Sequence, residues 1–104
     1  MAMAFYRLEQ LIKVTDGYRK VFDLPGKSIL LMREDGITYL LNNACPHLGV
    51  PLSKGRVKEG VIRCSGHGMR FDLTTGSPIQ NSSPCEKLEV LNAEYDNDYI
   101  GVSF

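Results

Sequence analysis

Turn-forming residues interrupt this sequence at short intervals, and their spacing constrains the fold more than any other feature. Pro25-Gly26, Glu34-Asp35-Gly36, Lys58-Glu59-Gly60, Thr74-Thr75-Gly76 and Asp96-Asn97-Asp98 each separate short apolar segments. Glycine, aspartate and asparagine adopt the backbone angles that tight turns need, and proline favours the first corner of a turn. The segments between these turns are too short for ordinary helices, so the sequence predicts an all-β fold built from antiparallel hairpins.

The turns predict where the strands lie. The expected strands are Tyr18–Leu24, Ser28–Arg33 with Ile37–Leu41, Val57 with Val61–Arg63, Met69–Leu73, and Leu88–Ala93 with Tyr99–Val102. Leu8–Lys13 is expected to form one short helical turn, because Leu8, Leu11 and Ile12 would share a face. No other segment suggests a helix of normal length.

The length of the chain and its number of cysteines limit the class of protein to which it can belong. A chain of 104 residues predicts a single domain over residues 1–104, with a core that a metal or cross-link would help to stabilise. The longest apolar run, Ile29–Met32, is far too short to span a membrane, and the start lacks the pattern of a secretory signal. Three cysteines are an odd number, which argues against a full disulfide framework and favours a cytoplasmic protein.

Charge is balanced overall but unevenly distributed. The net charge is zero, which argues against nucleic acid as the main partner. Residues 44–72 carry five basic side chains against two acidic ones. The simpler interpretation is an ordinary solvated surface. The sharper hypothesis is a basic rim that guides the docking of a protein partner. The basic side chains are Lys54, Arg56, Lys58, Arg63 and Arg70.

Two short motifs contain both histidines and two of the three cysteines: Cys45-x-His47 and Cys64-x-x-His67. The 16 residues between them, Leu48–Arg63, contain a predicted hairpin, so the two loops can meet at one tip of a sheet. Thiolate and imidazole are ligands of zinc and of iron. The spacing fits either one tetrahedral zinc or a two-iron, two-sulfide cluster. The alternative is a site without a metal, in which the histidines are ordinary loop residues and the cysteines are small buried side chains. The presence of two Cys/His pairs argues against this alternative.

The residues around these motifs resemble the Rieske iron–sulfur family. "CPHLGVPLSKGRV" and "VIRCSGHGMRFDLTTG" are similar to the two halves of its signature, C-x-H and C-x-x-H-G followed by an aromatic residue, Asp and a Thr-Gly turn. "LPGKSILLMREDGITYLLNN" and "SSPCEKLEVLNAEYDNDYIGV" resemble the hairpins that flank it. The resemblance begins at about Tyr6. It implies the Rieske fold, with stacked antiparallel β-sheets and a cluster-binding subdomain of two loops at one tip, at about residues 43–85.

The resemblance also implies a set of ligands for one [2Fe-2S] cluster. Cys45 and Cys64 would hold the inner iron, while His47 and His67 would hold the outer iron and turn their second ring nitrogens toward solvent. Cys85 lies in the segment that shields the cluster in the family. Since four ligands complete the site, we expect Cys85 to be a partly buried thiol rather than a ligand.

The positions around the ligands bear on the reduction potential. Histidine ligation places such clusters between roughly −150 and +300 mV. Val50 and Gly66 stand where high-potential members of the family have a disulfide, and Met69 and Phe71 stand where those members have a serine and a tyrosine. Hydrogen bonds to the cluster stabilise its reduced state, so their loss predicts a potential near the bottom of that range.

What the sequence lacks favours an electron carrier over an enzyme. No histidine remains for a mononuclear iron site, and there is no glycine-rich phosphate loop or flavin signature. The resemblance implies a soluble, monomeric ferredoxin that passes electrons from a flavin-containing reductase to a terminal oxygenase of the ring-hydroxylating dioxygenase type. The alternatives are the small subunit of an assimilatory nitrite reductase, a solitary Rieske protein with another partner, and a zinc-stapled structural or binding module.

Overall fold

The computed structural model describes residues 4–46, 49–64, 69–79 and 87–104. Within these ranges the fold consists of strands, and the single helical element is a 3-10 helix, η1 (Leu11–Lys13). The strands are β1 (Phe5–Gln10), β2 (Arg19–Leu24), β3 (Lys27–Glu34), β4 (Ile37–Asn42), β5 (Arg56–Lys58), β6 (Val61–Arg63), β7 (Arg70–Asp72), β8 (Pro78–Ile79), β9 (Val90–Leu91), β10 (Glu94–Asp96) and β11 (Tyr99–Ser103). The all-β prediction is therefore confirmed. No helix in these ranges has the length and apolar composition to cross a membrane.

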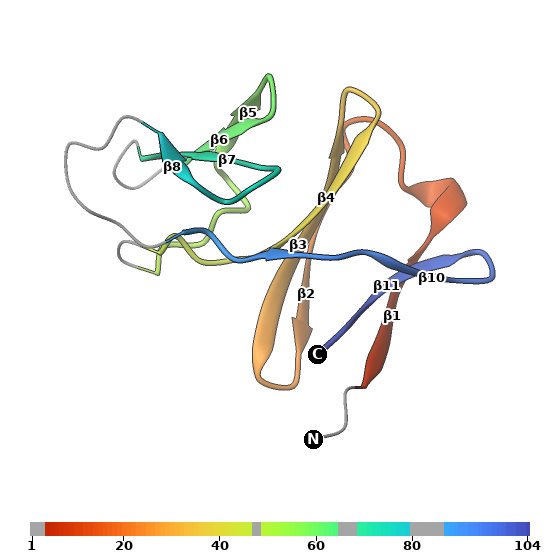
Figure 1. Cartoon of the computed structure of the whole chain (residues 1–104). Coiled ribbons are helices and arrows are strands. Elements are labelled where there is room, and N and C mark those ends of the chain that lie inside the picture. The colour runs from red at the N-terminus through yellow and green to blue at the C-terminus, as the bar shows by residue number, and fades with distance from the viewer. Residues whose placement is uncertain (1–3, 47–48, 65–68, 80–86) are drawn as a thin grey trace.

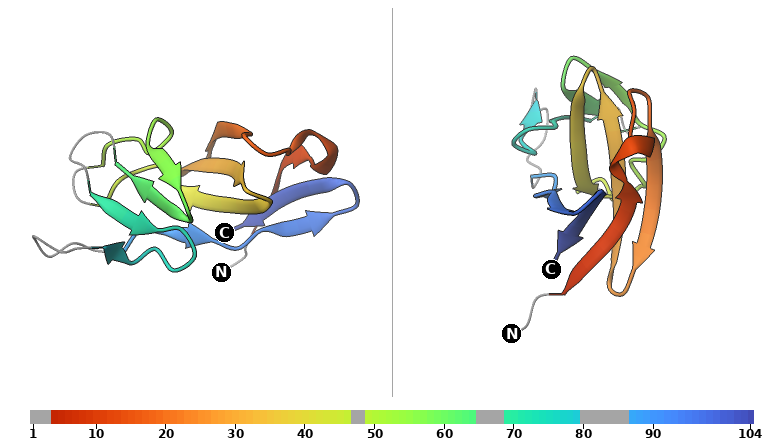
Figure 2. Two further views of the ribbon diagram at one scale, coloured as in Figure 1. Left: turned by 90° about the horizontal axis from the view of Figure 1, so that it is seen from above. Right: turned by 90° about the vertical axis from the view of Figure 1, so that its right-hand side faces the viewer.

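The strands form three antiparallel sheets in which the middle sheet contributes to both hydrophobic cores (Figure 1). The sheet orders are β1-β11-β10, β2-β3-β4-β9 and β5-β6-β7-β8. Figures 1 and 2 place the β5–β8 sheet at one end of the molecule and the turn between β10 and β11 at the other. The molecule is accordingly elongated, with extents of 43 × 34 × 19 Å.

Strand β3 is buried on both faces, and this explains its unbroken apolar run. Side chains of a strand alternate between the two faces of its sheet. Leu30 and Met32 enter the core shared with the β5–β8 sheet, which we call the loop-side core. Ile29 and Leu31 enter the core shared with the β1-β11-β10 sheet, which we call the terminal core. All four side chains have 0% exposure, and each buried aliphatic side chain contributes about 1.5–3 kcal/mol.

Two hairpins follow directly from their turn residues. Asp35-Gly36 links β3 to β4, and Glu59-Gly60 links β5 to β6, each as a two-residue turn. The φ angles are positive at both positions of each turn, at 52° and 79° in the first and 53° and 77° in the second. Type I′ turns require positive φ at both central residues, and their twist matches that of paired strands. Both of these predicted hairpins are confirmed.

For the hairpin at the C-terminal end, the prediction of the first strand was wrong. Leu88–Ala93 does not pair with Tyr99–Val102. Instead Glu94–Asp96 forms β10 beside β11, and Val90–Leu91 forms β9 beside β4. The physical reason is burial: Leu88 is buried in the loop-side core, and Leu91 packs against the terminal core. The apolar segment therefore closes an edge of the middle sheet, and the more polar segment, Glu94–Asp96, occupies an outer edge.

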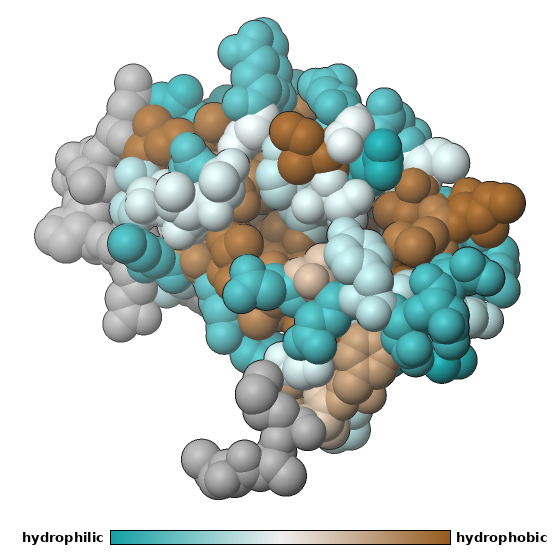
Figure 3. All heavy atoms as spheres, turned by 45° about the vertical axis from the view of Figure 1, so that its right-hand side comes forward, coloured by the Kyte–Doolittle hydropathy of each residue, from teal (hydrophilic) through white to brown (hydrophobic). Residues whose placement is uncertain are grey.

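The predicted helical turn near the N-terminus was right only in its second half. Leu11–Lys13 forms η1, whereas Leu8 lies in β1, a strand that local periodicity did not predict. Pairing with β11, far away in sequence, determines β1 and overrides the local helical pattern. Ile12 is consequently 84% exposed rather than packed in a core. Figure 3 shows hydrophobic side chains at several places on one face, including a group that projects at its right-hand edge.

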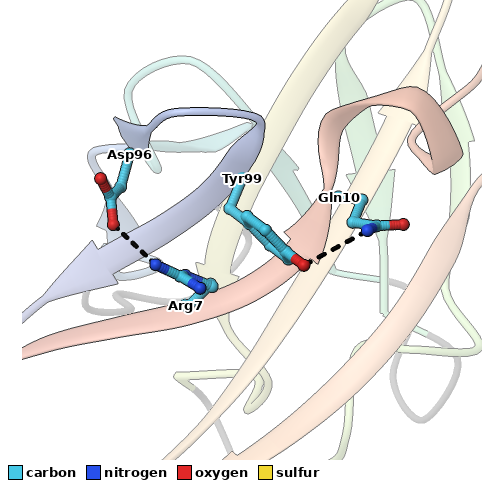
Figure 4. A network of polar contacts seen from close by, with 4 residues as sticks. All are labelled: Arg7, Gln10, Asp96 and Tyr99. Carbon is cyan, nitrogen blue, oxygen red and sulfur yellow. Dashed lines mark hydrogen bonds and ion pairs between the residues drawn. The ribbon is translucent and has the colours of Figure 1, made fainter.

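A polar network fastens β1 to the β10–β11 hairpin (Figure 4). The Arg7 guanidinium pairs with the Asp96 carboxylate at 2.9 Å and lies 4.4 Å from the centre of the Tyr99 ring. The Gln10 side-chain amide donates to the Tyr99 hydroxyl at 3.2 Å. These contacts are exposed or half-buried, so we expect them to select the strand register more than to stabilise the fold.

The first prediction concerns the effect of a substitution at Gly76 on thermal stability. Its φ is +80°, and a methyl group on its Cα would overlap the Leu88 carbonyl oxygen. Its own carbonyl accepts from the Leu88 N–H at 2.8 Å, which anchors the segment leading to β9. We expect Gly76→Ala to lower the thermal unfolding midpoint by about 10 °C, because backbone strain and steric overlap act together.

Gly26→Ala is the matched control for this substitution. Gly26 also has a positive φ, +78°, but its added methyl group would meet nothing within 4 Å. We expect a fall about half as large, from backbone strain alone. Equal midpoints for the two variants, measured by circular dichroism, would contradict the argument.

Candidate metal centre

Cys45 and Cys64 lie in the same buried region although 18 residues separate them in the chain. Cys45 follows the end of β4, and Cys64 directly follows β6. Both belong to the loop-side core, and each is 1% exposed. The middle sheet and the β5–β8 sheet thus deliver one thiol each to a shared, water-poor environment.

Each cysteine stands at the base of a loop that is closed in the same way. The Cys45 N–H donates to the Val50 carbonyl at 2.7 Å, and the Cys64 N–H donates to the Met69 carbonyl at 2.7 Å. In both cases the acceptor lies five residues further along the chain. The described ends of the two loops are therefore joined by the same kind of backbone hydrogen bond, which begins at the cysteine in each case.

The first loop has further anchors at both of its ends. The Gly49 N–H donates to the Cys45 carbonyl at 2.7 Å, and Gly49 has a φ of +75°, which glycine tolerates better than any other residue. Before the loop, the Asn43 N–H donates to the Ser28 carbonyl at 2.9 Å. After it, the Leu52 N–H donates to the Asn43 side-chain oxygen at 2.9 Å. Asn43 therefore joins the start of this loop to the chain that leaves it.

The remaining candidate residues lie outside the described residues. These are His47, His67, Gly66 and Cys85. The structure brings Cys45 and Cys64 into one core, but the full ligand set remains a prediction. Among the described residues, no three His, Cys, Asp or Glu side chains gather closely enough to hold a metal ion. Two buried thiols at the bases of matched loops, each loop containing one imidazole in its sequence, suit a mixed sulfur–nitrogen site.

The side chains that the resemblance connects with the potential are apolar. Phe71 is fully buried in the loop-side core, and Val50 and Met69 pack against that core. None of the three carries a hydroxyl or thiol group. Tyr39 is the hydroxyl-bearing aromatic of the same core. Burial raises the pKa of its phenol, with a smaller effect from Asp35.

Sequence reasoning missed Arg19, which ties the middle sheet to the segment after the first loop. Its guanidinium donates to the Ser53 carbonyl at 3.1 Å and to the Gly55 carbonyl at 2.6 Å. Glu34 lies 3.6 Å from the same guanidinium. No local signal identifies this role, because the two carbonyls lie 34 and 36 residues away in the chain.

Known proteins are similar to this chain in sequence and in fold. Residues 4–92 match the family model described as the Rieske [2Fe-2S] domain. The ferredoxin component of the alkene monooxygenase system of Xanthobacter autotrophicus is 31% identical over 87 residues, which is 83% of this chain and 71% of that protein. Mouse apoptosis-inducing factor 3 is 36% identical over 61 residues, which is 59% of this chain. The matched part spans only 10% of that longer protein.

Solved structures agree with this match. The ferredoxin of carbazole 1,9a-dioxygenase from Nocardioides aromaticivorans IC177 has a TM-score of 0.78 and 28% identity, covering 94% of this chain and 95% of that one. A ferredoxin solved in complex with the oxygenase of carbazole 1,9a-dioxygenase has a TM-score of 0.80 and 26% identity, covering 95% and 92%. The Sphingomonas yanoikuyae B1 ferredoxin, at 20% identity, shares the fold with a TM-score of 0.81, covering 97% and 99%.

The family match spans most of the described chain, including both closed loops and the strands that position them. This confirms the resemblance that the two Cys/His motifs indicated. The chain belongs to the Rieske [2Fe-2S] domain family.

Proposed function

We propose that this protein is a soluble, cytoplasmic one-electron carrier, taking electrons from a flavin-containing reductase and delivering them to a terminal oxygenase. One observation carries the proposal: two buried cysteines stand at the bases of matched, hydrogen-bonded loops, and each loop contains one histidine. The similarity to ferredoxin components of oxygenase systems supports the same role. The oxygenase complex of one such ferredoxin supports an oxygenase as the acceptor.

Each part of the site has a distinct task in this proposal. Cys45 and Cys64 would hold one iron through their sulfur atoms in the loop-side core, where burial excludes water. His47 and His67 would hold the other iron through their imidazole nitrogens. When bound, a [2Fe-2S] cluster supplies a centre that gains and loses a single electron. The hydrogen bonds to the Val50 and Met69 carbonyls fix the described ends of the two loops beside the cysteines.

The ligand set is tested by serine substitution of each cysteine. We expect Cys45→Ser and Cys64→Ser to lose most of their iron and the red-brown colour of the purified protein, because each removes a thiolate ligand. The matched control is Cys85→Ser, which should retain iron, sulfide and colour.

Metal and sulfide analysis, together with the electron-spin spectrum of the reduced protein, decides between the candidate sites. Two irons and two sulfides per chain with a rhombic signal of low average g support the proposal. One zinc per chain in a colourless protein would establish the zinc-stapled module instead. Loss of iron from Cys85→Ser would show that the ligand set is wrong.

The third prediction concerns the reduction potential. We expect a midpoint near the bottom of the range of roughly −150 to +300 mV, because no hydroxyl side chain stands at Met69 or Phe71. The double substitution Met69→Ser with Phe71→Tyr should raise the midpoint by supplying hydrogen bonds that stabilise the reduced state. Phe22→Tyr, in the terminal core, is the control and should leave the midpoint unchanged.

A potentiometric titration followed by visible absorption measures all three proteins. A clearly positive midpoint for the unsubstituted protein would contradict the prediction. So would equal midpoints for the double variant and the unsubstituted protein when both retain full iron content.

The partner assignment is tested by stopped-flow reduction with candidate flavin-containing reductases. We expect second-order reduction that slows as ionic strength rises, followed by reoxidation on mixing with an oxygenase. Failure with every flavin reductase, together with stable copurification with a nitrite reductase, would favour the small-subunit alternative.

A further inference from the structure

We propose that a basic groove on the outer face of the β5–β8 sheet is the docking site for an acidic surface of a protein redox partner. This inference rests on the proposed function and adds to it where the partner sits and what chemistry it presents. The groove has a volume of about 890 Å³, and strands β5, β6 and β7 supply most of its lining.

Strand register places three arginines in one row across this sheet. Arg56 of β5 lies opposite Arg63 of β6, and Arg63 lies opposite Arg70 of β7. Directly paired residues share a face, and their Cβ atoms are typically about 4.5–5.5 Å apart. The row faces away from the core, because the neighbouring residues Ile62 and Phe71 are fully buried.

A row of like charges destabilises a sheet, so it needs an explanation beyond folding. Within the described residues, no ion pair involves Arg56 or Arg63, nor Lys54 or Lys58, which line the same groove. Glu59 is the only carboxylate in the described lining. A facing set of carboxylates from another molecule would offset this repulsion, and the guanidinium group suits bidentate pairing with carboxylate.

The groove concentrates the basic charge of a chain that is neutral overall. Six of the 12 basic residues line it, together with one of the 12 acidic residues. The rest of the chain therefore carries six basic and 11 acidic residues and would repel an extended polyanion such as a nucleic acid. A folded protein needs to present only one acidic patch, so a protein partner fits this distribution better.

The groove also lies beside the second closed loop. Arg63 directly precedes Cys64, and Arg70 directly follows Met69, whose carbonyl accepts from the Cys64 N–H. A partner seated on the arginine row therefore contacts the base of that loop. Docking there would steer the partner toward the metal centre and raise the rate of encounter.

The first test measures binding in the oxidised holoprotein, with a fluorescent octaglutamate peptide as the probe. We expect salt-sensitive binding that weakens at least about tenfold in Arg56→Glu/Arg63→Glu. The control, Lys13→Glu/Lys20→Glu, makes the same change in net charge at exposed residues of η1 and β2. It should bind within about twofold of the unsubstituted protein. Equal loss in both variants would overturn the proposal, as would preference for a labelled single-stranded oligonucleotide of the same charge.

The second test uses electron transfer to two small oxidants of opposite charge. After reduction, Arg56→Glu/Arg63→Glu should react at least about threefold more slowly with anionic hexacyanoferrate(III) and faster with cationic hexaammineruthenium(III). Both differences should vanish in high salt. Parallel changes with the two oxidants would overturn the proposal. Absence of a two-iron spectrum would instead refute the proposed function, whereas the peptide measurement would still decide the groove's role.

Discussion

The burial of the middle sheet on both faces is the constraint on which the rest of this structure depends. Strand β3 sends Leu30 and Met32 into one core and Ile29 and Leu31 into the other. Neither outer sheet is large enough to bury a core alone, so each depends on this shared layer. Strand β4 does the same as β3, with Leu41 in the loop-side core and Leu40 in the terminal core, so the middle sheet as a whole joins the two ends of the molecule.

The two cysteines of the candidate metal centre are anchored in the loop-side core. Cys45 and Cys64 are packed into that core, and the loops are closed immediately above them by matched backbone hydrogen bonds. Asn43 and Arg19 then bind the connecting chain back to the middle sheet. These contacts anchor the described ends of both loops to the rest of the chain.

The sheet formed by β5, β6, β7 and β8 also determines where basic side chains gather on the surface. Strands β5, β6 and β7 are only three residues long each, and their inward positions are needed for the core. Their outward positions are therefore available for another role, and arginine occupies one such position in each strand. A neutral chain can thus present a strongly basic groove next to its candidate metal centre, which net charge alone conceals.

The success of sequence-based prediction depended on whether a feature is local. Asp35-Gly36 and Glu59-Gly60 were correctly predicted as turns because only neighbouring backbone angles determine them. Strand β1 and the exchange of roles between β9 and β10 were missed because they depend on distant pairing. Arg7 and Asp96, which meet across these strands, are 89 residues apart.

The sequence by itself determined the turns, the all-β class and the spacing of the Cys/His motifs. Turn geometry depends on the backbone angles of adjacent residues, and the type of ligand depends on the side chain at each position. Only the tertiary structure decided which strand lies beside which and that both cysteines share one core. It also decided that Arg56, Arg63 and Arg70 form a row. These outcomes follow from burying apolar surface among residues far apart in the chain, and a local pattern does not contain that information.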